Sequence, residues 1–134
     1  MIVVAAGDGS QHTHKVVDAA RKYARDGKIH FVYVSGTYIY PYMAASGAMV
    51  DFEAIRKSQT DDVWKMVGRL PDNATATTLE GGAPAAMIVD YAKNMDADLI
   101  VVGSRGRGAL STLLLGSVSH GLAHASDREV LIVK

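Results

Sequence analysis

Residues 97–119 read ADLIVVGSRGRGALSTLLLGSVS, and the rest of the chain is organised around this stretch. Its first six residues form a continuous apolar run rich in β-branched side chains, which predicts a strand buried on both faces. Glycines follow at 103, 106, 108 and 116, and Gly116-Ser117 is suited to begin a helix. Glycines allow close backbone approach, and free N–H groups at a helix start attract anions. The stretch therefore predicts a phosphate cradle, although such loops also occur as plain connections.

Common motifs of nucleotide and hydrolase sites do not fit this loop. Gly103 and Gly108 have the glycine spacing of a Walker A sequence, but Ala109 stands where the lysine is required. The dinucleotide fingerprint GxGxxG fails because Ser111 follows Gly106 and Gly108 at the third glycine position. The nucleophile elbow GxSxG is absent, so an esterase gains no support.

The composition sets broad limits on function. Apolar residues make up 49% and charged residues 21% of 134 residues, as in ordinary globular proteins. Fourteen basic and fourteen acidic residues balance, so nothing demands nucleic acid or an anionic membrane as partner. The absence of cysteine excludes disulfides and thiolate catalysis. With no long apolar run and no signal-peptide pattern, we expect a cytoplasmic protein with one domain over residues 1–134.

Apolar runs alternate with helical periods along the chain. Strands are predicted at 2–7, 29–34, 74–79, 96–102 and 130–133, with 74–79 near a sheet edge. A helix that closes at Asp26-Gly27 should bury one face made of Val16, Ala20, Tyr23 and Ala24. Further helices are predicted over 50–67, from Pro84 onward and over 116–125. Residues 35–50 show neither pattern and form either a packed connection or a mobile flap.

Five strands alternating with four helices predict an α/β fold, an open parallel sheet with helices on both faces. Ligands of such sheets bind at the carboxyl ends of the strands, where the strand order reverses. The first and fourth strands are the natural neighbours of that point. They end in the turn residues Gly7-Asp8-Gly9-Ser10 and at Gly103, respectively. The fold and the glycine loop therefore predict the same ligand edge.

One family pattern does fit the glycine spacing. Gly103-x-x-Gly106, nine residues and Gly116-Ser117 resemble the ATP-binding signature G-2x-G-9x-G-[S/T] of the universal stress protein family. The resemblance extends to VVAAGDGS near the start, DADLIVVGSRGRG in the middle and REVLIVK at the end, where Arg128 and Glu129 replace the family's Cys-Pro. It implies a single-domain Rossmann-like sheet of the adenine nucleotide alpha hydrolase-like kind, with strand order 3-2-1-4-5.

The resemblance also implies contacts with ATP, position by position. These are Gly7 and Asp8 after the first strand, with Asp8 on the ribose or adenine edge; Val34 on adenine through its backbone; Val102 and Gly103 flanking the nucleotide; Arg105 and Gly106 in the phosphate loop; and Gly116, Ser117, Val118 and Ser119 holding phosphates. Two departures are notable. Ala6 and Gly7 replace bulkier residues beside Asp8, and Gly121 should weaken the last helix by about 1 kcal/mol relative to alanine.

Little in the sequence points to catalysis or to a protein-bound metal. No catalytic residue is assigned, because Asp8 is the only acid near the predicted edge, and magnesium is expected, if at all, together with ATP. His120 and His124 have the i, i+4 spacing of a metal pair but lack a third ligand, so exposed positions are favoured. Solvated positions are likewise favoured for His12 and His14, although His12 lies within reach of the nucleotide edge.

The resemblance implies an ATP-binding stress or regulatory module that hydrolyses ATP slowly or not at all. It also implies a homodimer formed through the last strand, from Val130 to Val133. A slow ATPase or autophosphorylating enzyme on the same fold, and a nucleotide-free protein-interaction module, stay open as alternatives. An adenylyl transferase and a phosphoacceptor receiver are disfavoured, because GDGSQH does not match SGGxDS and Glu80 is a poor substitute for an aspartate ending the third strand.

Overall fold

The computed structural model describes residues 1–35, 51–105 and 115–134. Within these residues the elements in chain order are β1 (Ile2–Ala6), α1 (His12–Ala24), β2 (Lys28–Ser35), α3 (Phe52–Val67), β3 (Ala74–Glu80), α4 (Pro84–Asn94), β4 (Leu99–Gly103), α5 (Ser117–Ala125) and β5 (Glu129–Val133). Each strand and helix predicted from the sequence is present in the described segments, with ends that differ by a few residues. The question of a packed connection or a flap at 36–50 falls outside the described residues.

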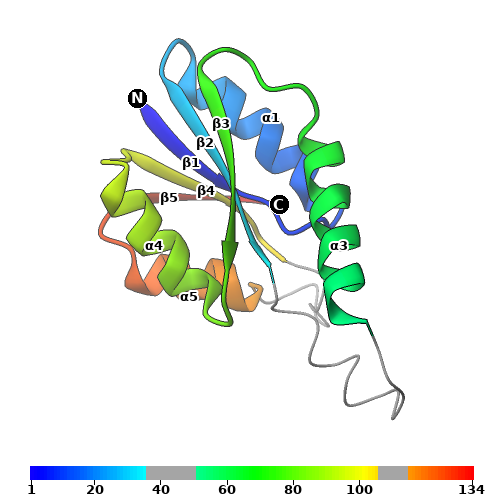
Figure 1. Cartoon of the computed structure of the whole chain (residues 1–134). Helices are drawn as coiled ribbons and strands as arrows, with labels where there is room; N and C mark the ends of the chain where they lie inside the picture. Colours follow the sequence, from blue (N-terminus) through cyan, green and yellow to red (C-terminus); the bar gives the residue numbers. More distant parts are fainter. Residues whose placement is uncertain (36–50, 106–114) are drawn as a thin grey trace.

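All strand pairs are parallel, and the sheet order is β3-β2-β1-β4-β5, as predicted (Figure 1). β1 lies at the centre, with Val3 opposite Ile29 of β2 on one side and opposite Leu99 of β4 on the other. The strand order reverses between β1 and β4, so a crevice at their carboxyl ends is the expected ligand position.

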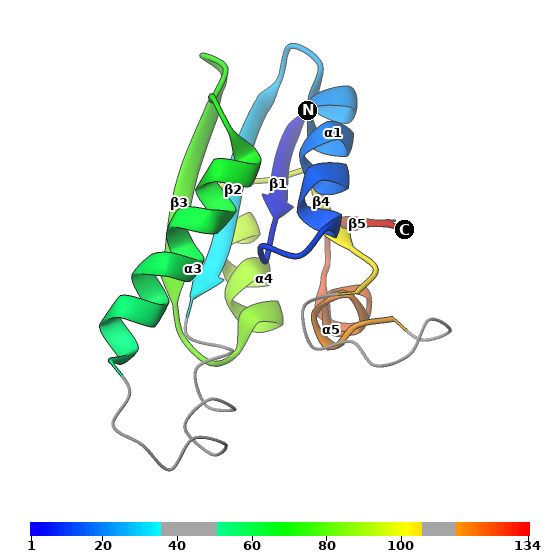
Figure 2. The ribbon, with the colours of Figure 1, turned by 90° about the vertical axis from the view of Figure 1, so that its right-hand side faces the viewer.

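Two helical layers cover the sheet, with α1 and α3 on one face and α4 and α5 on the other (Figures 1 and 2). Successive strand residues alternate between the layers: Val3 packs in the α1 core and Val4 in the α4–α5 core, and both are fully buried. Each such valine contributes about 1.5–3 kcal/mol through removal of its side chain from water. This two-sided burial explains why β1 and β4 are continuous apolar runs.

The prediction that Tyr23 belongs to the buried face of α1 is wrong, because its side chain is 45% exposed. Val16, Val17, Ala20 and Ala24 form the face that packs on the sheet, and Tyr23 lies at its margin. The ring instead lies beside the Lys22 ammonium, whose nitrogen is 5.6 Å from the ring centroid.

The two edges of the sheet differ in character. β3 forms one edge, as its threonine-rich sequence predicted, and Trp64 of α3 donates a 3.1 Å hydrogen bond to Thr78 on it. β5 forms the other edge and is partly buried along most of its length. Among the described helices, none is both long enough and apolar enough to cross a membrane.

Candidate functional site

A tight turn that follows β1 fixes the position of Asp8. One carboxylate oxygen, Oδ1, accepts a 2.8 Å hydrogen bond from the Ser10 N–H, and the Thr13 hydroxyl donates to the same oxygen over 3.5 Å. The Thr13 hydroxyl also accepts from the Gly9 N–H at 3.0 Å, where Gly9 has a φ of 83°. Because Oδ1 holds the turn, Oδ2 is the oxygen left to meet a ligand in the described part of the chain.

The first turn of α1 packs tightly against the ends of two strands. A Cβ placed on Gly7 would lie 2.9 Å from the Thr13 methyl carbon, and one placed on Gly103 would lie 2.9 Å from the His12 Cβ. Real Cβ atoms do not approach so closely, so both positions need glycine. Gly7 stands where the family has a bulkier residue, and here the Thr13 methyl group fills the space that such a side chain would need.

Both ends of the glycine loop are held at the same edge of the sheet. The carbonyl oxygen of Ser104 accepts from the Gly116 N–H at 2.6 Å and from the Ser119 hydroxyl at 3.0 Å. The Ser104 N–H in turn donates to the carbonyl of Val133 in β5 at 2.8 Å. These bonds fix where α5 begins, although residues 106–114 themselves lie outside the described segments.

The start of α5 has the features of an anion site. The first N–H groups of a helix have no acceptor within the helix, so those of Ser117, Val118 and Ser119 are available at its amino end. The Ser117 side chain is exposed, whereas Ser119 is buried and its hydroxyl is used to close the loop. A phosphate at this helix start would therefore meet the backbone N–H of Ser119 and not its hydroxyl, which is already hydrogen-bonded.

Strands β1, β2 and β4 end at one side of the sheet (Figure 2), and the predicted ligand residues in the described chain lie near these ends or at the start of α5. Asp8 follows β1 and Arg105 follows β4, both partly exposed, and Gly116 precedes α5. Val34 and Val102 are buried near the ends of β2 and β4. Gly106 lies outside the described residues.

The expectation that His12 is solvated is wrong, because the residue is only 7% exposed. It lies against Gly103, at the same edge as Asp8. The sequence signal for this contact is indirect: a strand that ends in glycine leaves room for the first turn of a helix packed beside it, here α1 beside the end of β4. The other predicted surface histidines, His14, His120 and His124, are exposed, and the described residues contain no group of three or more potential metal ligands.

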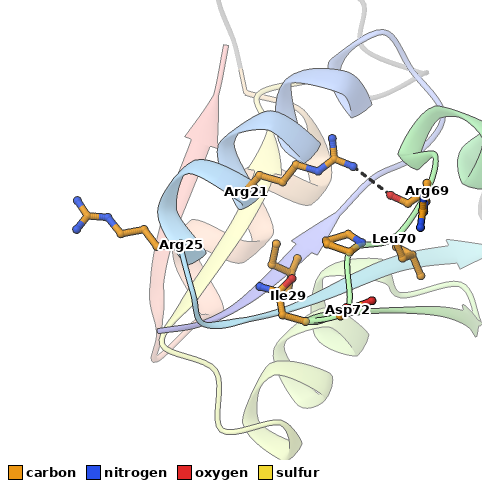
Figure 3. Close-up of a pocket in the computed structure, with 8 residues that line it drawn as sticks. Arg21, Arg25, Ile29, Arg69, Leu70 and Asp72 are labelled. Atoms are coloured by element: carbon orange, nitrogen blue, oxygen red, sulfur yellow. Dashed lines mark hydrogen bonds between the residues drawn. The ribbon is translucent and has the colours of Figure 1, made fainter.

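A separate hollow of about 550 Å³ lies at the opposite end of the strands from the predicted ligand site, where β2 begins (Figure 3). Its charged lining is made of three arginines and Asp72, but Arg21 reaches across to the carbonyls of Val67 and Arg69 at 3.5 and 3.4 Å, near the end of α3. The Arg25 side chain points away from the hollow (Figure 3). The arginines therefore do not converge on one point, and none of the predicted nucleotide contacts lies there.

Comparison with known proteins gives a consistent family match. The profile described as the universal stress protein family matches residues 1–134. Universal stress protein YxiE of Bacillus subtilis is 30% identical over 144 residues, which span 98% of this chain and 97% of YxiE. Universal stress protein MJ0531 of Methanocaldococcus jannaschii is 28% identical over 137 residues, which span 98% of this chain and 81% of that protein.

Solved structures share the same architecture. A universal stress protein crystallised in complex with cAMP is 29% identical, with a TM-score of 0.62 and coverage of 99% of this chain and 95% of that chain. The hypothetical protein MJ0577 is 18% identical, with a TM-score of 0.71 and coverage of 99% and 94%, which is a likeness of fold. Together with the predicted sheet order and the loop held at its edge, these matches show that the chain belongs to the universal stress protein family.

Proposed function

We propose that this protein binds ATP, or a related adenine nucleotide, at the carboxyl edge of the sheet between β1 and β4. In this proposal it serves as a regulatory module of the stress response. The observation that carries the proposal is the geometry of the glycine loop, whose two ends are joined through Ser104, Gly116 and Ser119 beside the start of α5. That arrangement keeps backbone N–H groups aimed at the point where phosphates would lie.

Two further observations support a nucleotide as the ligand. Asp8 is held by the turn after β1 with one oxygen free, which suits a hydrogen bond from a ribose hydroxyl or an adenine amino group. The relative that is 29% identical and was crystallised with cAMP has an adenine nucleotide as its ligand. The loop spacing of Gly103, Gly106 and Gly116-Ser117 extends this from an adenine nucleotide in general to ATP.

The same site is poorly equipped for rapid hydrolysis. Phosphoryl transfer to water needs an oriented water and a stabilised charge on the leaving phosphate. Arg105 can neutralise charge, but the only carboxylate in the described turns after β1 and β4 is that of Asp8, which already holds a turn. A magnesium ion that arrived with ATP would find the exposed Ser117 hydroxyl as a ligand and would help to neutralise the phosphates.

We also propose that two copies associate through β5. It is an edge strand, so one row of its N–H and C=O groups has no strand partner within the described sheet. Pairing with the β5 strand of a second copy would satisfy these groups and cover the half-buried apolar side chains between Val130 and Val133. Light scattering coupled to size-exclusion chromatography should give twice the chain mass at micromolar concentration, and a monomer there would contradict the proposal.

The nucleotide proposal is tested on the purified protein. Denaturation followed by chromatography identifies any nucleotide that was retained, and calorimetry measures binding of ATP, ADP, AMP and cAMP with and without magnesium. We expect binding of ATP, and slow or undetectable release of phosphate. No retained nucleotide and no binding at millimolar concentration would refute the proposal and favour a nucleotide-free interaction module.

A point substitution tests the location of the site. Gly106→Val puts a branched side chain into the phosphate loop and should abolish ATP binding while the protein stays folded. Gly82→Val is the matched control, because Gly82 lies beyond β3 and a Cβ placed there meets no atom within 4 Å. Undiminished ATP affinity of Gly106→Val would show that the loop is not the site.

A further inference from the structure

His12 occupies an unusual position for a polar residue at a ligand edge. It is the first residue of α1, it is 93% buried, and its Cβ and Cγ lie 2.9 and 3.5 Å from the point where a Cβ of Gly103 would be. Gly103 is the last residue of β4 and the first glycine of the predicted phosphate loop. The base of the His12 side chain therefore lies beside the point where that loop leaves the sheet.

The His12 ring has no polar partner within the described chain. The hydrogen bonds at this turn involve the His12 backbone N–H, which donates to the Ser10 hydroxyl at 3.3 Å, and none of the described residues bonds to the ring. The ring nitrogens are not among the fully enclosed side-chain atoms without a hydrogen-bond partner, which in the described chain are Arg56 Nε and Arg128 Nε, so they remain accessible. With no partner among the described residues, the ring nitrogens at this edge are available to a ligand.

The electrostatic setting of His12 indicates which part of the nucleotide it meets. α1 has no acidic residue within its first turn, and the Asp8 carboxylate held beside that turn by the Ser10 N–H and the Thr13 hydroxyl offsets part of the positive end of its dipole. Arg105, two residues beyond Gly103, adds a positive charge near the end of β4. A phosphate group is the part of an adenine nucleotide that this setting attracts.

α1 and α5 approach the end of β4 from opposite sides. Leu99 and Val101 pack in the α1 core, whereas Ile100 and Val102 pack in the core that contains Leu122 of α5. Gly103 continues this alternation, which is why it meets His12 of α1. Two helix starts therefore flank the point where the glycine loop begins; the sequence predicted an anion site at that of α5, and at that of α1 only that His12 lies within reach of the nucleotide edge.

We propose that the His12 imidazole binds a phosphate group of the nucleotide from the α1 side of Gly103, opposite the start of α5. The proposal rests on the nucleotide site proposed above and adds a phosphate contact from α1 to those expected from α5. In this arrangement His12 is a specificity determinant for the phosphorylated ligand, because adenosine alone would leave the imidazole without its partner.

The test uses two leucine substitutions two residues apart in α1, one at a buried and one at an exposed histidine. His12→Leu keeps a side chain of similar bulk against Gly103 and removes the ring nitrogens, whereas His14→Leu does the same at an exposed position in the same turn. Calorimetry with ATP and with adenosine measures affinity, and urea unfolding measures stability. We expect His12→Leu to weaken ATP binding about tenfold or more, because hydrogen bonds to a charged group are among the stronger ones. Adenosine binding, stability and all properties of His14→Leu should stay unchanged.

Two measurements keep the test decisive if His12→Leu does not fold. His12→Gln retains an amide donor and should recover part of the ATP affinity. In the unaltered protein, the ring ¹⁵N signals of His12 should shift on addition of ATP but not of adenosine, while those of His14 stay in place.

The outcomes separate this proposal from the nucleotide site itself. If the unaltered protein binds ATP and His12→Leu binds it equally well, the role of His12 is refuted and the nucleotide site stands. An equal loss of ATP and adenosine binding would mean that His12 supports the fold or the nucleoside, which also refutes a phosphate contact. If the unaltered protein binds no adenine nucleotide, both proposals fail together.

Discussion

Thr13 is the residue on which the turn after β1 depends most. It is 1% exposed, its hydroxyl bonds to both the Gly9 N–H and the Asp8 carboxylate, and its methyl group fills the space beside Gly7. One side chain thus links the packing of α1 to the position of the predicted ribose ligand. Because the two roles use different atoms of the side chain, substitutions can separate them.

Thr13→Val keeps the shape of the side chain and removes the hydroxyl. The Gly9 N–H then loses its partner and Asp8 loses one of its two bonds, so the free energy of unfolding should fall by about 1–3 kcal/mol. ATP affinity should fall as well, because Asp8 is less well held. Urea unfolding and calorimetry measure the two effects.

Thr13→Ser is the matched control, because it keeps the hydroxyl and removes the methyl group. It should lose stability through the small cavity beside Gly7 but keep most of the ATP affinity. If both variants bind ATP equally, the hydroxyl does not position Asp8 for the ligand.

Single residues were harder to predict from the sequence than elements. The glycine spacing and Asp8 carry a local pattern, so their place at the edge could be expected. The burial of His12 and the bonding of Ser104 could not, because they depend on how α1 and β5 pack against the end of β4. Such contacts join residues that are far apart in the chain, so they produce no periodic pattern in the sequence.

At the scale of elements, the strands were predictable because two-sided burial selects continuous apolar runs. β1 and β4 are the clearest cases. The helix α1 was predicted in place but not in detail: its buried face is centred on Val17 and Ala20, which leaves Tyr23 at the margin. Periodicity locates a buried face to within about one residue position around the helix, and the neighbouring elements decide the rest.

Gly121 shows how packing can reverse the effect on stability that helix propensity alone would predict for a residue. The sequence argument counted only its helix propensity, which favours alanine by about 1 kcal/mol. In the structure a Cβ at Gly121 would lie 2.8 Å from the Cβ of Ala85 in α4. The glycine therefore allows α4 and α5 to approach each other closely.

Gly121→Ala should destabilise the protein despite the better helix propensity. Neither Cβ belongs to a flexible side chain, so the two helices must move apart, and overpacking of this kind costs about 1–3 kcal/mol. The net loss in the free energy of unfolding should be about 1 kcal/mol. Urea unfolding measures the loss.

The double variant Ala85→Gly with Gly121→Ala is the control for that contact. It transfers the methyl group from one helix to the other and should recover stability relative to Gly121→Ala alone, which a double-mutant cycle records as coupling. Additive effects of the two changes, or a gain in stability for Gly121→Ala, would show that the helix contact is not limiting.

At the scale of the whole molecule, the topology was predictable because the alternation of strands and helices leaves few alternatives. Parallel strands bring β1 and β4 side by side, so Asp8 and Gly103 meet at one edge although they are far apart in the chain. The polar contacts that join the two layers to the sheet were not predictable in this way. His30 is the clearest of them.

His30 joins three elements on the α4 side of the sheet. Its ring nitrogen Nδ1 lies 2.8 Å from the Thr75 hydroxyl of β3, and its ring meets the Tyr91 ring of α4 edge-on, with centroids 6.1 Å apart. Burial, and then the positive charge of Lys28, lowers the pKa of His30 below its usual value of 6.5. The folded protein therefore favours the neutral imidazole.

The direction of this pKa shift makes stability depend on pH. Well above pH 6.5 the ring is neutral in both folded and unfolded chains, so His30 contributes no pH dependence there. As the pH falls below 6.5 the unfolded chain takes up a proton first, and stability is lost until the pH reaches the lower pKa of the folded state. We expect His30→Gln, which cannot titrate, to lose less stability between about pH 7.5 and about pH 5.5 than the unaltered protein. Urea unfolding of both proteins at the two pH values makes the comparison, and acidic groups common to both cancel in the difference. Parallel losses in the two proteins would show that His30 is as easily protonated in the folded chain as in the unfolded one.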